Sequence, residues 1–343
     1  MRNYLCISVD GLQSGMIGAY GNTWIQTPTL DSLACQSALF DRFYASSMDL
    51  PAAFTELWQL LPDCHNILCT DDAEVFLHEK AGLFGEKHRL EPKRRKQPAN
   101  RIEETQFFRN MATAAGLLRH REKPFFLWTH FKGFRGDWDF PLSYRERYQI
   151  DEDPDPYAEV IPPEIAGKNI DPDIRQSARE AYSGGVTVLD EALAGLLAFL
   201  EESGLDKNTV LLFMSVRGFS LGEHNYIGGN GELYGENVHL PLFLRFPDGV
   251  FSGFRSQTLL QPADVFNLYS GRRDGGGDVG FLPEEPGEVH PFLRIADEVI
   301  ITPDWFVYQK PAGTELYVKP DDRWEVNDVA ARCPHVLEQI AGC

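Results

Sequence analysis

Short, strongly apolar segments recur along this chain. Between them lie stretches in which apolar residues recur at the intervals typical of a helix. The clearest are residues 5–9, 124–131 (PFFLWTHF), 209–215 (TVLLFMS) and 241–246 (PLFLRF). Residues 173–203 repeat apolar side chains at helical spacing, and Gly204 follows as a C-cap. Buried strands that alternate with helices are typical of a mostly parallel sheet covered on both faces. We therefore predict an α/β fold.

Weaker patterns complete the expected order of elements. Helices are predicted at 28–37, 51–61 and 103–121, strands at 38–44 and 66–70, and a surface excursion rich in proline and acidic residues at 144–172. Residues 299–302, 305–309 and 314–318 are predicted to form a small antiparallel sheet, followed by a helix from about residue 326. These patterns suggest an α/β domain over 1–270, a Gly-rich connector over 271–280 and a small C-terminal subdomain over 281–343.

The composition excludes some classes of partner. The chain has 343 residues and a formal net charge of −19, so its surface repels nucleic acids and anionic membranes on average. We find no run of about 18 apolar residues, and no basic and apolar leader precedes the first strand. A cytoplasmic location is therefore expected, with the six scattered cysteines as reduced thiols.

One segment runs against the acidic composition. Residues 87–101 carry seven basic side chains: Lys87, Arg89, Lys93, Arg94, Arg95, Lys96 and Arg101. A solvated loop is one interpretation, and a docking patch for an anionic partner is the other.

Five segments in the same order resemble a known family. The chain opens with YLCISVDG and TPTLD, and later carries PFFLWTHFKG, GFSLGEHN, GGNGELYGENVHLPLFLRF and a C-terminal WFVYQ…ELYVKPDD pattern. Together they resemble the sulfatase family of the alkaline-phosphatase-like superfamily. The resemblance implies a central mostly parallel sheet with helices on both faces, plus a small C-terminal antiparallel sheet and helix. It also implies hydrolysis of sulfate or phosphate esters around calcium or magnesium.

The metal-ligand positions that this resemblance implies are mostly substituted. Asp10 is retained, but the second ligand position is Gly11, and the next two are Val216 and Arg217. A hard dication needs several oxygen ligands, and a single carboxylate would hold it weakly. We therefore expect no cofactor, or calcium or magnesium if the site has been rebuilt with other residues.

The catalytic positions are substituted as well. The resemblance aligns Asp49 with the nucleophile, although the alignment could slip by one residue, and Asp cannot be converted to formylglycine. Arg135 stands where the family has a histidine, and Asn230 where it has a lysine. His130 and His224 remain as candidate ligand-binding residues, though an ordinary hydrogen-bonded histidine is the favoured interpretation of His130, and His224 alone is no catalytic signature.

These substitutions leave three hypotheses open. The first is a degenerate sulfatase that binds a small anionic ligand or a protein, with Arg217 between Asp10 and Asp49 in place of the cation. The second is a metal-dependent hydrolase with a rebuilt site, using Asp49 or carboxylates from Asp137 or Asp139. The third is a scaffold subunit that acts through residues 87–101 or the acidic surface.

Overall fold

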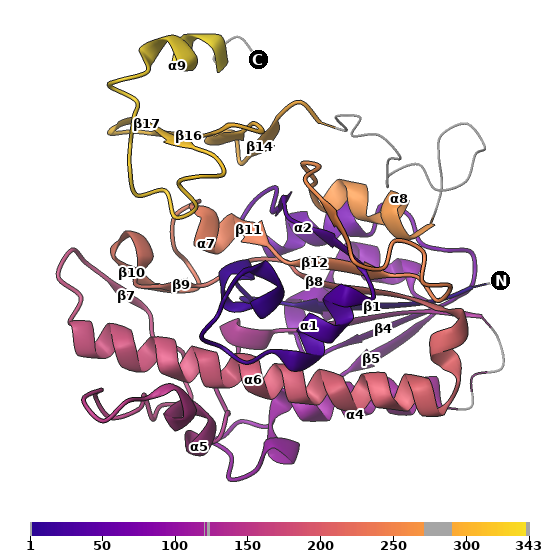
Figure 1. The fold of residues 1–343 in the computed structure, drawn as a ribbon. Helices are drawn as coiled ribbons and strands as arrows, with labels where there is room; N and C mark the ends of the chain where they lie inside the picture. Colours follow the sequence, from indigo (N-terminus) through magenta and orange to yellow (C-terminus); the bar gives the residue numbers. More distant parts are fainter. Residues whose placement is uncertain (1, 120, 122–123, 271–289, 341–343) are drawn as a thin grey trace.

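A sheet of eight strands forms the centre of the molecule (Figure 1). The computed structural model describes residues 2–119, 121, 124–270 and 290–340. The strand order is β13-β2-β12-β8-β1-β6-β4-β5. The strands are β1 (Asn3–Val9), β2 (Ala38–Phe40), β4 (His65–Thr70), β5 (Glu86–Arg89), β6 (Phe125–Phe131), β8 (Thr209–Ser215), β12 (Leu242–Arg245) and β13 (Phe254–Ser256).

The register of the inner strands determines which residues share an edge of the sheet. β1 pairs in parallel with β6 and with β8, and Val9 lies opposite both Phe131 and Ser215. β4 also runs parallel to β6. Within this sheet β12 is antiparallel to both of its neighbours. The residues that directly follow β1, β4, β6 and β8 therefore meet at one edge, where open α/β sheets place their functional sites.

Helices cover both faces of the sheet (Figure 1). On one face, α1 (Pro28–Cys35), α4 (Gln106–Leu118) and α6 (Pro172–Glu202) pack on Leu5, Ile7 and Val9 in one core cluster. On the other face, α2 (Leu50–Leu57) and α8 (Val265–Ser270) pack around Cys6 in a second cluster, to which Val75 of α3 (Ala73–Leu77) also belongs. Alternate side chains of β1 thus pack into the clusters on opposite faces of the sheet, because successive residues of a strand point to opposite sides.

The long helix α6 is apolar enough, by length and composition, to cross a membrane. However, 67% of its apolar window is buried inside the molecule. Its contacts with α4, α5 (Leu142–Arg145) and α1 account for that burial, so its composition is that of a core helix.

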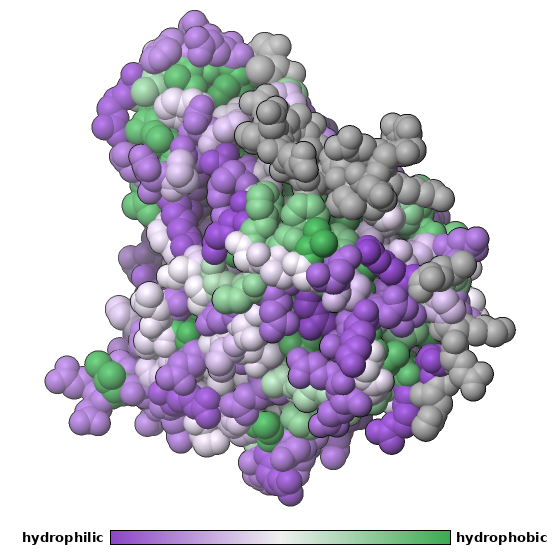
Figure 2. Space-filling model, turned by 45° about the vertical axis from the view of Figure 1, so that its right-hand side comes forward, coloured by the Kyte–Doolittle hydropathy of each residue, from purple (hydrophilic) through white to green (hydrophobic). Residues whose placement is uncertain are grey.

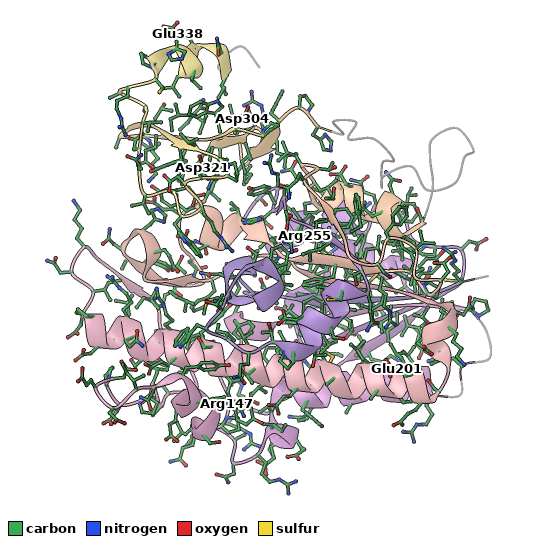
Figure 3. All side chains as sticks on the ribbon, in the orientation of Figure 1. Arg147, Glu201, Arg255, Asp304, Asp321 and Glu338 are labelled. Carbon is green, nitrogen blue, oxygen red and sulfur yellow. The ribbon has the colours of Figure 1, made fainter. Side chains whose placement is uncertain are left out.

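The C-terminal residues form a separate sheet. Its strands are β14 (Leu293–Ile295), β15 (Val299–Ile301), β16 (Trp305–Lys310) and β17 (Gly313–Val318), and α9 (Pro334–Ile340) follows. Figure 2 shows this part as a lobe on the main body, with hydrophilic side chains gathered between the two. Exposed charged residues such as Glu338 on the lobe and Glu201 on α6 point outward (Figure 3).

Several short strands and one short helix lie outside the eight-stranded sheet. β3 (Phe43–Tyr44) pairs with β11 (His239–Leu240), and β10 (Tyr226–Gly228) lies between β7 (Ile165–Ala166) and β9 (Ser220–Leu221). The four-residue helix α7 (Gly235–Val238) precedes β11.

The predicted α/β fold is confirmed, but several boundaries were wrong. The expected strand 38–44 is divided into β2 and β3, because the chain turns at Asp41 and Arg42. The final helix begins at Pro334 rather than near 326, because residues before it are tied to β17, for example by Val329 N–H donating to Leu316 O. The predicted connector 271–280 lies outside the described residues, and the division into domains stays a prediction.

The basic segment 87–101 is also more structured than a loop. Lys87 and Arg89 belong to β5, the edge strand of the central sheet. Arg95 forms an ion pair with Glu104, and Arg101 with Glu103. Much of its positive charge is therefore compensated nearby.

Candidate functional site

A buried ion pair occupies the edge of the sheet where β1 and β8 end. The Arg217 guanidinium binds the Asp10 carboxylate through both oxygens, with Nε 3.1 Å from Oδ1 and Nη2 2.5 Å from Oδ2. Nη1 of Arg217 donates to the carbonyl of Met48 at 3.0 Å. Asp10 is fully buried. Such a two-point pair fixes both side chains and satisfies charges that would be costly to bury alone.

Arg135 is a second cation beside the same carboxylate. Its Nε lies 3.4 Å from Oδ1 of Asp10. Burial alone would raise the pKa of Asp10, but Arg217 and Arg135 outweigh that effect and hold the pKa below its ordinary value. Burial lowers the pKa of Arg135 to about 10, which leaves it charged at neutral pH. The cluster therefore carries one negative and two positive charges.

Gly11 leaves little room for a carboxylate side chain. Its backbone has φ +80°, and an added Cβ would lie 3.0 Å from Cβ of Phe134 and 3.2 Å from Cγ of Arg135. Its carbonyl accepts a hydrogen bond from the Tyr182 hydroxyl at 2.6 Å. Val216 is 1% exposed and packs in the apolar cluster around α2. Both substituted ligand positions are thus integrated into the core.

These residues do not fit a divalent cation. Among the described residues, no group of three or more His, Cys, Asp or Glu side chains is arranged to hold one. The one retained carboxylate at this position, that of Asp10, already accepts from Arg217, and the guanidinium lies where a cation would need open coordination sites. We derive no reaction step through a metal at this position.

The structure places Asp49 outside this cluster, so its predicted pairing with Arg217 was wrong. Asp49 is exposed and caps α2, where its Oδ1 accepts from the backbone N–H of Ala52 at 3.0 Å. A capping carboxylate satisfies a free N–H group at the start of the helix. Arg217 instead contacts the preceding residue through the Met48 carbonyl.

His130 lies beneath the cluster, fully buried at the end of β6. Its Nδ1 is 3.0 Å from the Ser8 hydroxyl, which also accepts from Nε1 of Trp128 at 2.9 Å. Nε2 has no hydrogen-bond partner among the described residues. Burial lowers the pKa of His130 to about 4, so the ring is neutral at neutral pH.

The two remaining predicted residues have partners other than Asp10, although Asn230 follows Gly229, which lies beside the Arg135 guanidinium. His224 stacks on Tyr234 with ring centroids 3.4 Å apart, and its Nδ1 is 3.0 Å from Glu236. Asn230 is exposed, and its amide donates to Glu164 at 2.9 Å. The structure therefore brings together Asp10, Arg217, Arg135 and His130, but not Asp49, His224 or Asn230.

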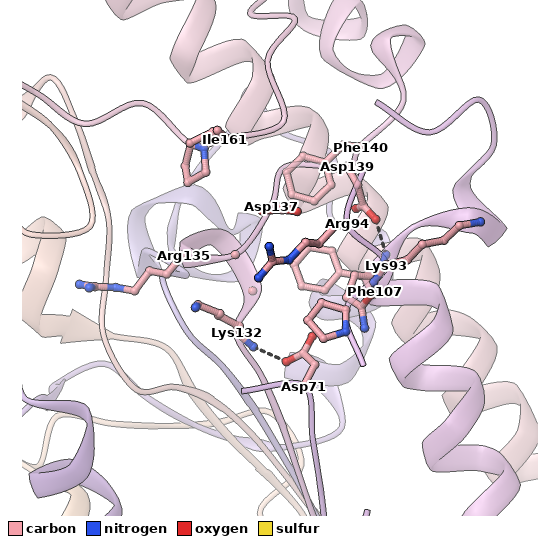
Figure 4. A pocket seen from close by; sticks show the side chains of 15 residues that line it. Asp71, Lys93, Arg94, Phe107, Lys132, Arg135, Asp137, Asp139, Phe140 and Ile161 are labelled. Atoms are coloured by element: carbon pink, nitrogen blue, oxygen red, sulfur yellow. Dashed lines mark hydrogen bonds between the residues drawn. The ribbon is translucent and has the colours of Figure 1, made fainter. Parts of the chain in front are cut away.

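A cavity of about 370 Å³ opens beside this cluster, with Arg135 on its wall (Figure 4). Four cations and three carboxylates line it, together with aromatic and aliphatic side chains: Lys93, Arg94, Lys132, Arg135, Asp71, Asp137, Asp139, Phe107, Phe140 and Ile161. Figure 4 shows Lys132 near Arg135, whose guanidinium points away from the other labelled side chains. The volume is that of a small-molecule site.

Two carboxylates of this cavity are buried and perturbed. Asp71 accepts from the Lys132 N–H at 2.8 Å, and Asp139 from the Gln106 N–H at 2.8 Å. Burial raises the pKa of each to about 6. Asp139 thus binds the first turn of α4 and does not complete a metal site with Asp10.

Asp71 is a residue of this site that was not predicted from the sequence. The position of Asp71 directly after a buried strand could have identified it, because the carboxyl ends of parallel strands lie at one edge of the sheet.

The fold and the edge site define an α/β protein of the alkaline-phosphatase-like type. Residues 81–269, more than half of the chain, match the sulfatase family, and the chain belongs to that family.

Two curated relatives match shorter segments of the chain. The arylsulfatase of Clostridium perfringens is 30% identical over 149 residues, which are 40% of this chain and 31% of the relative. The N-acetylglucosamine-6-O-sulfatase of Bacteroides thetaiotaomicron is 32% identical over 83 residues, or 24% of this chain and 15% of the relative. The matched segments thus span less than a third of either relative.

Solved structures resemble the chain over nearly its whole length. The phosphonate monoester hydrolase of Agrobacterium radiobacter has a TM-score of 0.74 at 17% identity, covering 99% of this chain and 94% of that one. A protein solved with its substrate D-glucosamine-2-N,6-O-disulfate has a TM-score of 0.75 at 15% identity, with coverages of 99% and 95%. At these identities the similarity establishes the fold alone.

Proposed function

We propose that this chain is a catalytically degenerate sulfatase that binds a ligand or partner and does not hydrolyse sulfate esters. The observation that supports this proposal is the two-point contact of Arg217 with the buried Asp10. A guanidinium at this point supplies positive charge permanently, but it offers no open coordination site for a substrate oxygen.

The neighbouring residues support the same conclusion. A second oxygen ligand at position 11 would meet Phe134, and Asp49 is used as a helix cap. Restoring the metal mechanism would therefore require several coordinated changes. The overall fold of the family is retained, and a retained fold with a permanent internal cation is compatible with binding.

The cavity beside Arg135 is the place where a small anionic ligand would bind. Arg94 and Lys132 are exposed cations on its wall, and neither forms an ion pair with a described carboxylate. Phe107 and Phe140 add apolar surface to the wall. A protein partner that presents an acidic side chain could use the same charges.

Metal content and turnover test this proposal together. The purified protein is dialysed against calcium and magnesium and then against metal-free buffer, its metals are measured by elemental mass spectrometry, and 4-nitrophenyl sulfate hydrolysis is followed. We expect neither near-stoichiometric metal nor turnover. Retained metal with turnover that Asp10→Asn abolishes would instead establish the hydrolase with a rebuilt site.

A binding measurement tests the positive half of the proposal. 4-Nitrophenyl sulfate should bind the wild-type protein, and Lys132→Gln and Arg94→Gln should each weaken that binding several-fold. Arg147→Gln, which is not among the residues that line the cavity, is the control that should change nothing. Equal affinity in all four proteins would contradict binding at this cavity.

A further inference from the structure

A second cavity lies where the C-terminal lobe meets the central sheet. Its volume is about 330 Å³. One side comes from the main body, through the β2–β3 turn, β3, β11 and β13, and the other from the β15–β16 turn and the segment after β17. Figure 3 places Arg255 on the body side of this junction and Asp321 on the lobe side. We call this cavity the junction pocket.

The junction pocket is strongly basic, although the chain is acidic. Arg42, Arg255, Lys319 and Arg323 line it, and Asp41 is the only carboxylate on its wall among the described residues. A local excess of positive charge on a chain with net charge −19 needs a specific explanation, because carboxylates are available throughout the surface.

Two of the four cations are already neutralised. Arg255 forms an ion pair with Asp41, and its Nη1 donates to the Ala19 carbonyl at 2.8 Å. Lys319 forms an ion pair with the buried Glu325. These two cations therefore shape the walls and leave little charge for a ligand.

The other two cations have no acidic partner among the described residues. Arg42 donates through Nε to the Gln257 side-chain oxygen at 3.2 Å and forms no ion pair. Arg323 lies over the Trp324 ring, 5.0 Å from its centroid, and likewise forms no ion pair. Burial lowers the pKa of Arg323, and the charge of Asp41 offsets that effect in part, as an added anion also would. Two guanidiniums without a carboxylate thus share one pocket.

Aromatic side chains form part of the rest of the wall. Tyr44 stacks on His239 with centroids 5.0 Å apart, and the Tyr20 hydroxyl donates to the Phe40 carbonyl at 2.9 Å. Nε2 of His239 donates to the Asp41 carbonyl at 2.7 Å, and burial lowers the pKa of His239 to about 4. The ring is therefore neutral and fixed, and it presents a flat surface beside the two free arginines.

We propose that the junction pocket binds a small molecule carrying a tetrahedral oxyanion, a phosphate or sulfate group, held between Arg42 and Arg323. The planar guanidinium fork matches two oxygens of such a group at once. The remaining volume and the Tyr44 face accommodate a ring attached to the oxyanion. Because Arg42 belongs to the body and Arg323 to the lobe, the ligand bridges the two parts. This site is separate from the Asp10 cluster and does not depend on the function proposed above.

Calorimetric titration at constant ionic strength tests this proposal. The probes are inorganic phosphate, inorganic sulfate, glucose 6-phosphate, glucose 6-sulfate and uncharged glucose. We expect saturable binding of the charged sugars, weaker binding of the inorganic ions and none of glucose. The ratio between the phosphate and sulfate probes then identifies which oxyanion the pocket prefers.

Variants locate the binding. Arg42→Gln and Arg323→Gln should each weaken binding about 10-fold, the loss typical of one charge-assisted contact. Arg294→Gln, an exposed arginine of β14 outside the pocket, is the matched control that should retain full affinity. Since Arg42 is on the surface turn, its variant keeps the test informative even if Arg323→Gln folds poorly. Absence of saturable binding, or equal affinity in Arg42→Gln, would overturn the proposal.

Discussion

Removing Arg217 should expose the energetic role of the buried pair most directly. Arg217→Met keeps an apolar stem of similar length but leaves the Asp10 carboxylate without its two-point partner. Breaking a buried ion pair in this way typically destabilises a protein by 3–5 kcal/mol. Arg135 remains, with Nε 3.4 Å from Oδ1, and compensates in part. We therefore expect a loss of about 3 kcal/mol at neutral pH.

The loss should depend on pH in a defined direction. In the wild-type protein the pKa of Asp10 lies below its unfolded value of about 3.9, so its contribution is present above that pH and is lost as the pH falls through the folded pKa. Without Arg217, burial dominates and raises the pKa of Asp10. The variant then loses stability as the pH rises above about 4. The difference between the two proteins should grow from about pH 4 to about pH 7.

Urea unfolding at several pH values measures this difference. Asp10→Asn and the double variant Asp10→Asn/Arg217→Met complete a double-mutant cycle, in which Arg217→Met should cost less when the carboxylate is absent. Arg147→Met, which breaks an exposed pair of 3.5 Å with Glu191, is the control and should cost less than about 1 kcal/mol. An Arg217→Met loss equal to that control, or independent of pH, would refute the reasoning.

Three further predictions concern single residues. Gly11→Asp and Gly11→Ala should both destabilise the protein by about 1–3 kcal/mol in thermal unfolding, because φ is +80° and Cβ would contact Phe134; a neutral Gly11→Ala would contradict this. Asp49→Ala should cost about 1 kcal/mol and Asp49→Ser should restore it, since the carboxylate caps α2; equal losses would argue against a cap. Burial raises the pKa of Asp139 to about 6, so ionisation opposes folding as the pH rises. Asp139→Asn should therefore gain about 1–2 kcal/mol at about pH 7 but nothing near pH 3, as urea titration can measure.

The order of the main elements was predictable because it depends on local pattern. Continuous apolar runs such as 124–131 and 209–215 are typical of buried strands, and the apolar spacing over 173–203 is typical of a helix. The contact between Asp10 and Arg217 was also predictable, since both residues follow parallel strands. The boundaries at 38–44 and at 326 were wrong because turns and tethers to other strands decided them.

The sequence by itself determined the class of fold, the sulfatase resemblance and the loss of ligand side chains at positions 11, 216 and 217. Only the tertiary structure decided that Asp49 is a cap, that Asp71 lines a cavity and that Arg42 and Arg323 share a pocket. The physical reason is the distance along the chain over which each effect acts. Periodicity and residue type act over a few neighbours, whereas a side chain's partner depends on packing between segments that the sequence keeps far apart.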